Sequence, residues 1–439
     1  MSPLYIGLLV AFVLIMVLLS GVPVAFSLGI VAIVFLVIFD GVDSLSVMAD
    51  TLFGGLNEFA LLSIPMFILM GAAVASSRAG SDLYETLERW LYKVPGGLII
   101  SNIGACSIFA ALSGSSPATC AAIGKMGIPE MQKRGYPDSL ATGAIAAGGT
   151  LGILIPPSIT MIVYGIATET SIGRLFIAGI IPGIMLTVFF MAWSLYYAKR
   201  NGFHFKLGDK GYSWKEKFEI LPKILPFLLI IALILYSLYG GIATPSEAAG
   251  VGAFICIGLV ALIYKMWSLR EHWEILRTAM RESVMIMMII GAAALFSYMM
   301  SSLYITQSLA EWITTLDISP LALLLCVNLF LLVAGLFLPP VAVILMAAPT
   351  LLPIVETLGY DPIWFGVMLT LNMEIGLITP PVGLNLYVIN SIAPDIKLTT
   401  ILWGALPFML CMLLGIFLLI LFPGIATWLP EAMMGVAQY

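Results

Sequence analysis

The sequence predicts an all-α polytopic membrane protein built from two repeats of opposite membrane topology. Of the 439 residues, 61% are hydrophobic and only 10% are charged, whereas soluble domains carry roughly 25% charged residues. Apolar segments of about 20 residues, long enough to cross a bilayer, recur along the whole chain. The segment 150–158 (TLGILIPPS) also returns in altered form as 374–382 (EIGLITPPV), each with a glycine four residues before a Pro-Pro pair.

We predict about ten full transmembrane helices, since each crossing needs about 20 apolar residues. In the first repeat, residues 1–220, they are expected at 3–20, 22–39, 57–77, 138–168 and 175–198. In the second repeat, residues 221–439, they are expected at 221–240, 246–264, 283–302, 362–392 and 399–422. The spans 138–168 and 362–392 contain the Pro-Pro pairs and are predicted to be broken helices.

Two further apolar segments, 96–124 and 318–354, are interrupted by proline or small polar residues and are predicted to be re-entrant hairpins. Segments 81–94 and 304–316 are amphipathic and are predicted to lie along the membrane interface. With both hairpins re-entrant and the basic loop 199–223 in the cytoplasm, only Arg174 of the 19 basic residues falls outside. Single crossings would move the basic residues of 78–93 to the other side.

An internal repeat supports the same topology. At an offset of 224 residues, matching positions carry glycine, tyrosine or proline: Pro129 and Pro353, Gly135-Tyr136 and Gly359-Tyr360, Gly152 and Gly376, Pro156-Pro157 and Pro380-Pro381. Because each repeat holds an odd number of full spans, the second must be inverted. A chance period in apolar sequence is the alternative, and these glycine and proline matches at one offset disfavour it.

The two breaks indicate a transporter. A double proline removes two backbone donors and cannot continue a helix. In hydrocarbon, freed backbone groups are tolerated only where protein or a water-filled cavity surrounds them. Broken spans at corresponding places in two halves of a chain indicate a transporter's binding site.

Each break has a hairpin beside it in the predicted topology. Ser113-Gly114-Ser115-Ser116-Pro117 offers hydroxyl and carbonyl oxygens to a cation, and the helix that starts there favours an anion at its N-terminus. Packing by small residues is the alternative reading. The second break supplies Asn372, Glu374, Gly376, Thr379 and Asn385, and its hairpin supplies Gly335, Pro339 and Pro340. We therefore expect two cation sites, one per repeat, with unlike donors.

Glu374 is the acid predicted to lie deepest in the membrane, and such a residue indicates function. Three roles are open: charge compensation for a bound cation, a proton relay, or a structural bond to exposed backbone near the break.

The sequence lacks the residues that other functional classes of protein require. Both histidines, His204 and His272, fall in predicted loops, so neither a Ser–His dyad nor a histidine metal site is expected, and the chain is predicted not to be an enzyme. No Walker A motif, basic stripe or CxxC spacing occurs, which disfavours ATP binding, nucleic acid and disulfides. The N-terminal apolar run is predicted to be a first span and not a cleaved signal. An ion channel is the remaining alternative, although two inverted halves, each with a hairpin, are unusual for one.

The motifs 113–119 (SGSSPAT), 127–131 (GIPEM), 148–158 (GGTLGILIPPS) and 374–385 (EIGLITPPVGLN) resemble those of one family. The family is the large membrane subunit of tripartite ATP-independent periplasmic (TRAP) transporters, and the resemblance covers essentially the whole chain.

The resemblance implies sodium-driven uptake of an organic anion by an elevator movement, with C4-dicarboxylates as the first expectation and sugar acids or keto acids as alternatives. It implies two partners, a separate small four-helix membrane subunit and a periplasmic substrate-binding protein. The location implied is the bilayer of the bacterial inner membrane. The charge distribution, counted outward from the basic loop, predicts both termini in the periplasm.

The resemblance also implies site residues. Expected sodium-binding residues are Ser113, Ser115, Ser116, Gly149, Gly152, Gly335, Gly376 and Thr379. Expected substrate-binding residues are Ser116, Pro117, Thr119, Pro156, Pro157, Pro340, Pro380 and Asn385. Some members that carry sialic acid have aspartate where this chain has Thr119, which argues against sialic acid.

Overall fold

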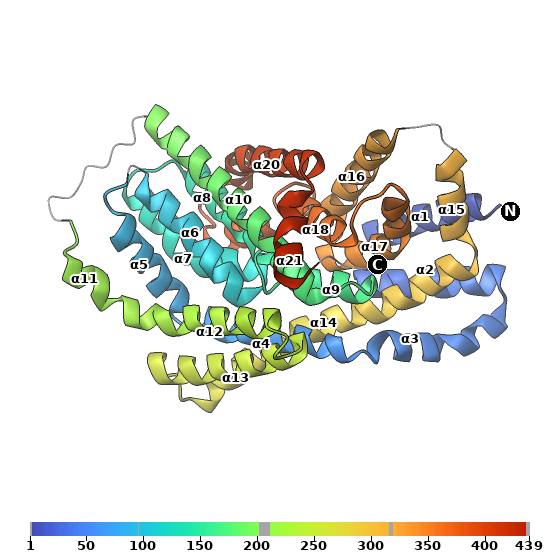
Figure 1. Cartoon of the computed structure of the whole chain (residues 1–439), viewed down its shortest axis with the longest axis horizontal. Coiled ribbons are helices and arrows are strands. Elements are labelled where there is room, and N and C mark those ends of the chain that lie inside the picture. Colours follow the sequence, from blue (N-terminus) through green and yellow to red (C-terminus); the bar gives the residue numbers. More distant parts are fainter. Residues whose placement is uncertain (1, 95, 202–210, 316–318, 436–439) are drawn as a thin grey trace.

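The computed structural model describes residues 2–94, 96–201, 211–315 and 319–435 (Figure 1). These residues form helices and connecting segments without a β-strand, so the predicted all-α class is confirmed. Part of the basic loop 199–223, the end of the amphipathic segment 304–316 and the start of the hairpin segment 318–354 lie outside the described residues.

The helices follow one another in two runs. The first run is α1 (Pro3–Leu19), α2 (Val24–Phe39), η1 (Val42–Val47), α3 (Met48–Leu56), η2 (Phe59–Leu62), α4 (Ser63–Ser76), α5 (Ala79–Leu91), α6 (Gly97–Ser113), α7 (Ser116–Lys133), α8 (Asp138–Thr150), η3 (Leu151–Ile153), α9 (Ile159–Ala167) and α10 (Ile172–Arg200). The second run is α11 (Trp214–Glu219), α12 (Leu221–Tyr239), α13 (Pro245–Tyr264), α14 (Leu269–Ser302), α15 (Ile305–Thr315), α16 (Pro320–Phe337), α17 (Pro340–Thr357), α18 (Pro362–Leu377), α19 (Leu384–Ile392), α20 (Leu398–Leu421) and α21 (Gly424–Met434).

Eight helices within the described residues are long and apolar enough to cross a membrane. Six of them coincide with predicted full spans: η2 with α4, then α10, α12, α13, α14 and α20. The other two are α16 and α17, the arms of the second predicted hairpin, with 18 residues each. Helices α1 and α2 are shorter, with 17 and 16 residues, and the two spans with Pro-Pro pairs are divided into shorter helices. The re-entrant path and the inverted relation of the halves stay predictions.

Two groups of helices can be followed in Figure 1. Helices α2, α3 and α4 each pack against α14, and α13 packs against α4 and α12 in the lower row of the view. The second group surrounds α8 and α18: α6, α7 and α20 pack against α8, whereas α16, α17 and α10 pack against α18. Both predicted hairpins and both broken spans belong to this second group.

Helices α8 and α18 form the centre of the second group. Every residue of α18 from Pro362 to Leu377 is buried, as is every residue of α8 from Leu140 to Thr150. A helix that is apolar all round must be covered on all sides. Both central helices therefore end, at Thr150 and Leu377, inside the protein.

Helix α5 corresponds to the first amphipathic segment, and its polar residues take part in packing. The carboxylate of the buried Glu88 forms an ion pair with Arg134, at the end of α7. Asp82, also buried, lies 3.4 Å from Nζ of Lys223 in α12. Burial alone would lower the pKa of Arg134, but Glu88 and Glu130 raise it above its usual value. The ion pairs therefore hold α5 against the end of α7 and the start of α12.

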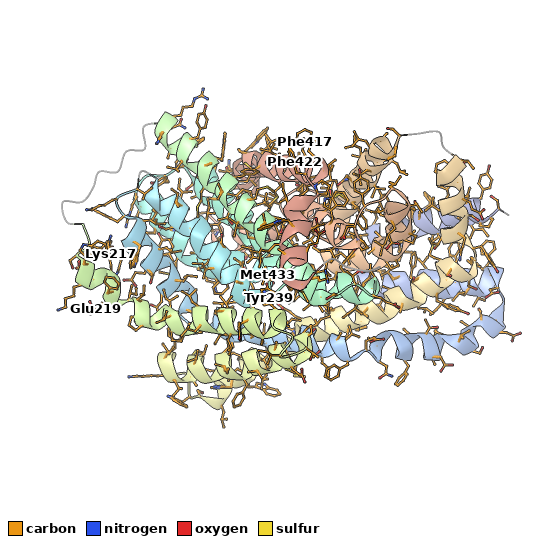
Figure 2. All side chains as sticks on the ribbon, viewed as in Figure 1. Lys217, Glu219, Tyr239, Phe417, Phe422 and Met433 are labelled. Atoms are coloured by element: carbon orange, nitrogen blue, oxygen red, sulfur yellow. The ribbon has the colours of Figure 1, made fainter. Side chains whose placement is uncertain are left out.

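Both charged and large apolar side chains are exposed at the surface. Figure 2 shows Lys217 and Glu219 of α11 at one end of the molecule, away from Phe417 and Phe422 at the end of α20. These two phenylalanines are 55% and 59% exposed. Many apolar side chains on the candidate membrane spans are exposed in this way, as expected for a protein that is surrounded by lipid.

Candidate functional site

The first break separates α8 from α9. Helix α8 ends at Thr150, η3 follows, and Pro156-Pro157 precedes the N-cap Ser158 of α9. The Ser158 hydroxyl accepts a hydrogen bond of 3.3 Å from the amide of Met161, and the Thr160 hydroxyl donates one of 3.1 Å to the carbonyl of Ile153. Side chains thus bind backbone groups that the break removes from the helix.

The tip of the first hairpin lies on this break. Helix α6 ends at Ser113, Gly114 has a φ of +58°, and α7 starts at Ser116. Glycine adopts this left-handed conformation without steric penalty. It also allows close approach, because a Cβ added to Gly114 would lie 2.9 Å from the carbonyl oxygen of Pro157. The tip is therefore fixed against the Pro-Pro pair.

Hydroxyl groups at this tip form a connected set. The hydroxyls of Ser113 and Thr119 are 2.8 Å apart, and Thr119 also donates to the carbonyl of Ser115 at 2.9 Å. Ser116 donates to the carbonyl of Thr150 at 3.2 Å. A Cβ on Gly152 would lie 2.7 Å from the carbonyl oxygen of Ser115.

These contacts bring together most residues predicted for the first sodium site. Gly149 joins them, because a Cβ there would lie 3.2 Å from the carbonyl oxygen of Ser116. One hairpin tip and one break thus meet here, and that they hold a sodium ion stays a prediction.

The second break and the second hairpin meet in a similar way. Helix α16 ends at Phe337, before Pro339 and Pro340, and α18 ends at Leu377. The amide of Val382, within the break, donates a 3.2 Å hydrogen bond to the carbonyl of Leu336. A Cβ on Gly376 would lie 2.6 Å from the carbonyl carbon of Gly335.

Thr379 is the hydroxyl residue of the second break. It donates a 2.6 Å hydrogen bond to the carbonyl of Ile375, one turn earlier in the chain. Its hydroxyl oxygen also lies 3.5 Å from the sulfur of Met409 in α20. The second break therefore offers backbone carbonyls and one hydroxyl where the first offers several hydroxyls, and the two cation sites themselves stay predictions.

Helix termini give both sites the same electrostatic character. The C-terminal ends of α6 and α8 meet at the first site, and those of α16 and α18 meet at the second. Each helix C-terminus carries a partial negative charge and free carbonyl groups. Two such ends side by side favour a cation, even without a carboxylate.

The helices that follow the breaks cross between the halves. Helix α9 packs on α17, and α19 packs on α7. The Asn385 amide donates a 3.2 Å hydrogen bond to the carbonyl of Ala146 in α8, and the thiol of Cys120 in α7 points to the same carbonyl at 3.8 Å. The predicted substrate residue Asn385 therefore lies beside the first half's hairpin.

Glu374 is fully buried in α18, and neither of its carboxylate oxygens has a hydrogen-bond partner among the described residues. Asn372, two residues earlier in α18, does have a partner: its amide donates a 2.9 Å hydrogen bond to the side-chain oxygen of Asn328 in α16. One oxygen each of Asn372 and Asn385 also lacks a partner in the described part. No partner for the structural-bond role of Glu374 is found among the described residues, and its role with a cation, a proton or the backbone stays a prediction.

The remaining predicted substrate residues are prolines beside the tips and breaks. Pro117 lies in the first turn of α7 and Pro340 begins α17, whereas Pro156 and Pro380 each precede a second proline in a break. Both Pro-Pro peptide bonds are cis.

Three buried groups were not singled out from the sequence. They are Asn328, the carbonyl of Ala146, and Asn102 in α6, whose amide has no hydrogen-bond partner among the described residues. An available signal was the pair of asparagines in the first arms of both hairpins, Asn102 and Asn328, since an amide in an apolar helix needs a partner. A carbonyl leaves no sequence signal.

Known proteins resemble this chain over nearly its whole length. Residues 10–425 match the family model described as "Tripartite ATP-independent periplasmic transporter, DctM component". The C4-dicarboxylate TRAP transporter large permease protein DctM of Pseudomonas aeruginosa is 40% identical over 390 residues, which are 89% of this chain and 90% of that protein. The corresponding Rhodobacter capsulatus protein is 35% identical and covers 97% of this chain and 98% of its own length.

Relatives with other named substrates also match. The sialic acid TRAP transporter large permease protein SiaM of Vibrio cholerae is 32% identical, over 95% of this chain and 97% of its own. The YdaH transporter of Alcanivorax borkumensis has a similar fold, with a TM-score of 0.63, 17% identity, and coverage of 89% of this chain and 90% of its own. Close relatives are thus permease subunits and not enzymes. By the match of residues 10–425 to the family model and by the identity to these relatives, the chain belongs to the DctM family of TRAP transporter large permease components.

Proposed function

We propose that the chain carries out sodium-coupled uptake of an organic anion across the bacterial inner membrane, with C4-dicarboxylates as the substrate. A periplasmic binding protein delivers the anion, and a small four-helix membrane subunit accompanies the chain. The observation that carries the proposal is the repeated arrangement in which a hairpin tip meets a helix break.

Sodium is supported by the chemistry of the two sites. Carbonyl and hydroxyl oxygens are the ligands that hard cations prefer, and broken transporter helices offer them to Na⁺. The first ion would be held by oxygens of Ser113, Ser115, Ser116 and the chain around Gly149 and Gly152. The second would be held by carbonyls around Gly335 and Gly376 with the Thr379 hydroxyl. The hydroxyls now bonded to one another could turn to an ion.

Binding of an anion is supported by the helix N-termini at the same places. Helices α7, α9, α17 and α19 begin at the tips and breaks, and free N–H groups at helix N-termini attract negative charge. Thr119 and Asn385 supply polar side chains nearby. An anion beside two sodium sites would compensate their charge, which explains why cation and substrate binding would be coupled.

An elevator movement is supported by the grouping of helices. Both hairpins and both broken spans pack around α8 and α18, and the group formed by α2, α3, α4 and α14 lies beside them. The group around α8 and α18 would move as a unit, since α9 with α17 and α19 with α7 join its two halves.

The choice of C4-dicarboxylate follows the relatives at 40% and 35% identity, which are named for that substrate, ahead of the sialic acid relative at 32%. Uptake of radiolabelled succinate into proteoliposomes tests it. The liposomes would contain this chain with its small membrane subunit, and the cognate binding protein would be added outside.

We expect uptake only with an inward sodium gradient and the binding protein present. Uptake of a sugar acid or keto acid in place of succinate would reassign the substrate while keeping the mechanism. Ion conductance that needs neither binding protein nor anion would instead show a channel.

A further inference from the structure

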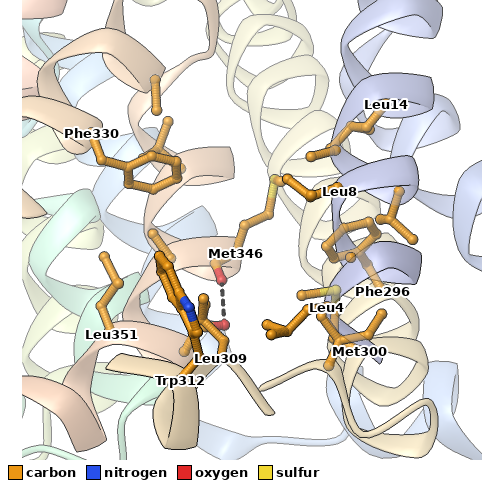
Figure 3. Close-up of a pocket in the computed structure, with 18 of the residues that line it drawn as sticks. Leu4, Leu8, Leu14, Phe296, Met300, Leu309, Trp312, Phe330, Met346 and Leu351 are labelled. Atoms are coloured by element: carbon orange, nitrogen blue, oxygen red, sulfur yellow. Dashed lines mark hydrogen bonds between the residues drawn. The ribbon is translucent and has the colours of Figure 1, made fainter. Parts of the chain in front are cut away.

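A cavity of about 660 Å³ lies beside the second predicted hairpin (Figure 3). It is bordered by α16 and α17 on one side and by α1, α15 and the end of α14 on the other. None of the predicted sodium-binding or substrate-binding residues lines it. The proposed transport function therefore leaves this cavity without a role.

The lining excludes a charged ligand. It is composed mainly of leucine, phenylalanine, methionine and alanine side chains, with no Asp, Glu, Lys or Arg. The hydroxyl of Thr350 already donates a 3.2 Å hydrogen bond to the carbonyl of Met346, marked by the dashed line in Figure 3. A small polar anion or a sodium ion would lose its hydration here and gain no partner.

The cavity is continuous with the lipid-facing surface. Two of its lining side chains, Leu8 of α1 and Phe330 of α16, are 69% and 56% exposed. Helices α14, α16 and α17 have the length and composition of membrane spans. In a bilayer, acyl chains cover such a surface, so an acyl chain is the apolar group that meets the opening.

The two ends of the cavity differ. Tyr5 and Trp312 border one end, and aromatic side chains with a polar tip gather at the head-group level of a membrane. Figure 3 shows Trp312 and Met300 at this end and Leu14 and Phe330 at the other. From Leu4 to Leu14 the cavity follows α1 for about 15 Å, at 1.5 Å per helical residue. An elongated apolar chain with one polar end would fit a cavity of this form.

We infer that one acyl chain of a bilayer phospholipid occupies this cavity, with its head group near Tyr5 and Trp312 and its tail toward Leu14 and Phe330. The inference of a lipid-binding site does not rest on the proposed function. Its position between α17 and α1 has a further consequence, which rests on the proposed function. The lipid chain lies on the boundary across which the second hairpin would move, so acyl-chain composition would affect the uptake rate.

A photoactivatable lipid tests the binding site. The purified full-length chain is reconstituted into liposomes that contain a trace of phosphatidylethanolamine with a diazirine near the end of one acyl chain. After illumination, labelled peptides are mapped by mass spectrometry. We expect saturable labelling of peptides from α1 and from α16–α17, several-fold weaker in Ala334→Phe, which places a ring in the cavity. Ala232→Phe, on the exposed side of α12, is the matched control and should leave the labelling unchanged.

Several results would overturn the inference. They are equal labelling in Ala334→Phe and the parent chain, labelling by a diazirine fatty acid but not by the phospholipid, and loss of labelling when the small membrane subunit is added. Ala334→Leu serves in place of Ala334→Phe if the larger substitution aggregates on gel filtration. Labelling needs neither a sodium gradient nor substrate, so failure of the proposed transport function would leave its outcome unaffected.

Discussion

At the scale of single residues, close backbone contact explains the glycines of the two sites. Gly152 lies against the Ser115 carbonyl, and Gly376 lies against Gly335. The sequence could predict both glycines because they repeat at one offset beside Pro-Pro pairs. It could not predict the partner of Asn385, since that partner is the backbone carbonyl of Ala146, which every residue type has.

Gly152→Ala should reduce uptake strongly while leaving a folded protein. Its Cβ would lie 2.7 Å from the carbonyl oxygen of Ser115, so the hairpin tip must shift, and such overpacking typically costs about 1–3 kcal/mol. Sodium-dependent uptake in proteoliposomes measures the effect. Gly258→Ala in α13 is the control, because nothing lies within 4 Å of its added Cβ. Equal uptake by both variants would mean that the tip is not held in this position during transport.

Glu374→Gln should weaken the sodium dependence of uptake. The carboxylate is buried without a hydrogen-bond partner among the described residues, and a hydrogen bond to a charged group contributes about 1.5–3 kcal/mol. We expect the sodium concentration for half-maximal uptake to rise about tenfold, since about 1.4 kcal/mol corresponds to a factor of ten. A changed pH dependence with unchanged sodium dependence would assign the proton role instead.

At the scale of helices, the sequence predicted where most spans lie but less well where they end. The predicted span 283–302 is the second part of a longer helix, α14, whose first turns carry the charged residues of a loop-like sequence. Ser268 and Glu271 form a capping box that starts α14 early. The first hairpin likewise extends beyond the predicted residue 124, because α7 continues to Lys133 through Pro129. Apolar periodicity detects the part of a helix inside the membrane and not its extension into water.

The N-terminus of helix α11 should lose order in acid. The Glu216 carboxylate accepts hydrogen bonds from the backbone amide and the hydroxyl of Ser213, which lower its pKa. A lowered folded-state pKa gives stability that is present above the unfolded pKa and is lost as pH falls through the folded value. The Arg89 guanidinium, which donates to the Glu216 carbonyl at 2.7 Å, then loses an ordered partner.

Amide hydrogen exchange across residues 214–219 measures this change, after correction for the intrinsic pH dependence of exchange. We expect protection to fall as pH drops below the ordinary carboxyl range. Glu216→Gln should show weak protection at every pH. A parent chain with the same protection at all pH values would contradict the prediction.

At the scale of the whole molecule, the apolar composition of the sequence was enough to predict a membrane protein. Its topology, in contrast, can be assigned only relative to a membrane. The charge distribution predicts that both ends of the first hairpin region, at Lys93 and Lys133, face the cytoplasm. Helix α10, with 29 residues, then connects Ser171 outside to the basic loop inside.

Cysteine labelling in right-side-out vesicles tests this topology, in a background where the exposed Cys326 is replaced by Ala. Lys93→Cys and Lys133→Cys should both resist a membrane-impermeant maleimide until the vesicles are opened. Ser171→Cys should react at once, and Lys215→Cys should behave as the cytoplasmic reference. Reaction of only one of the two lysine positions in sealed vesicles would show that this region crosses the membrane.

The packing of α9 on α17 and of α19 on α7, each pair joining the two halves, has a consequence for synthesis of the protein. Helix α7 is complete long before its packing partner α19 leaves the ribosome, and α9 must wait for α17. Neither half can cover its own central surfaces, so neither is an independent folding unit. The first half must remain in the membrane as an open assembly until the second half is inserted. Expressed alone, it would be an obvious target for membrane quality-control proteases, whereas two half-chains made together could rescue each other.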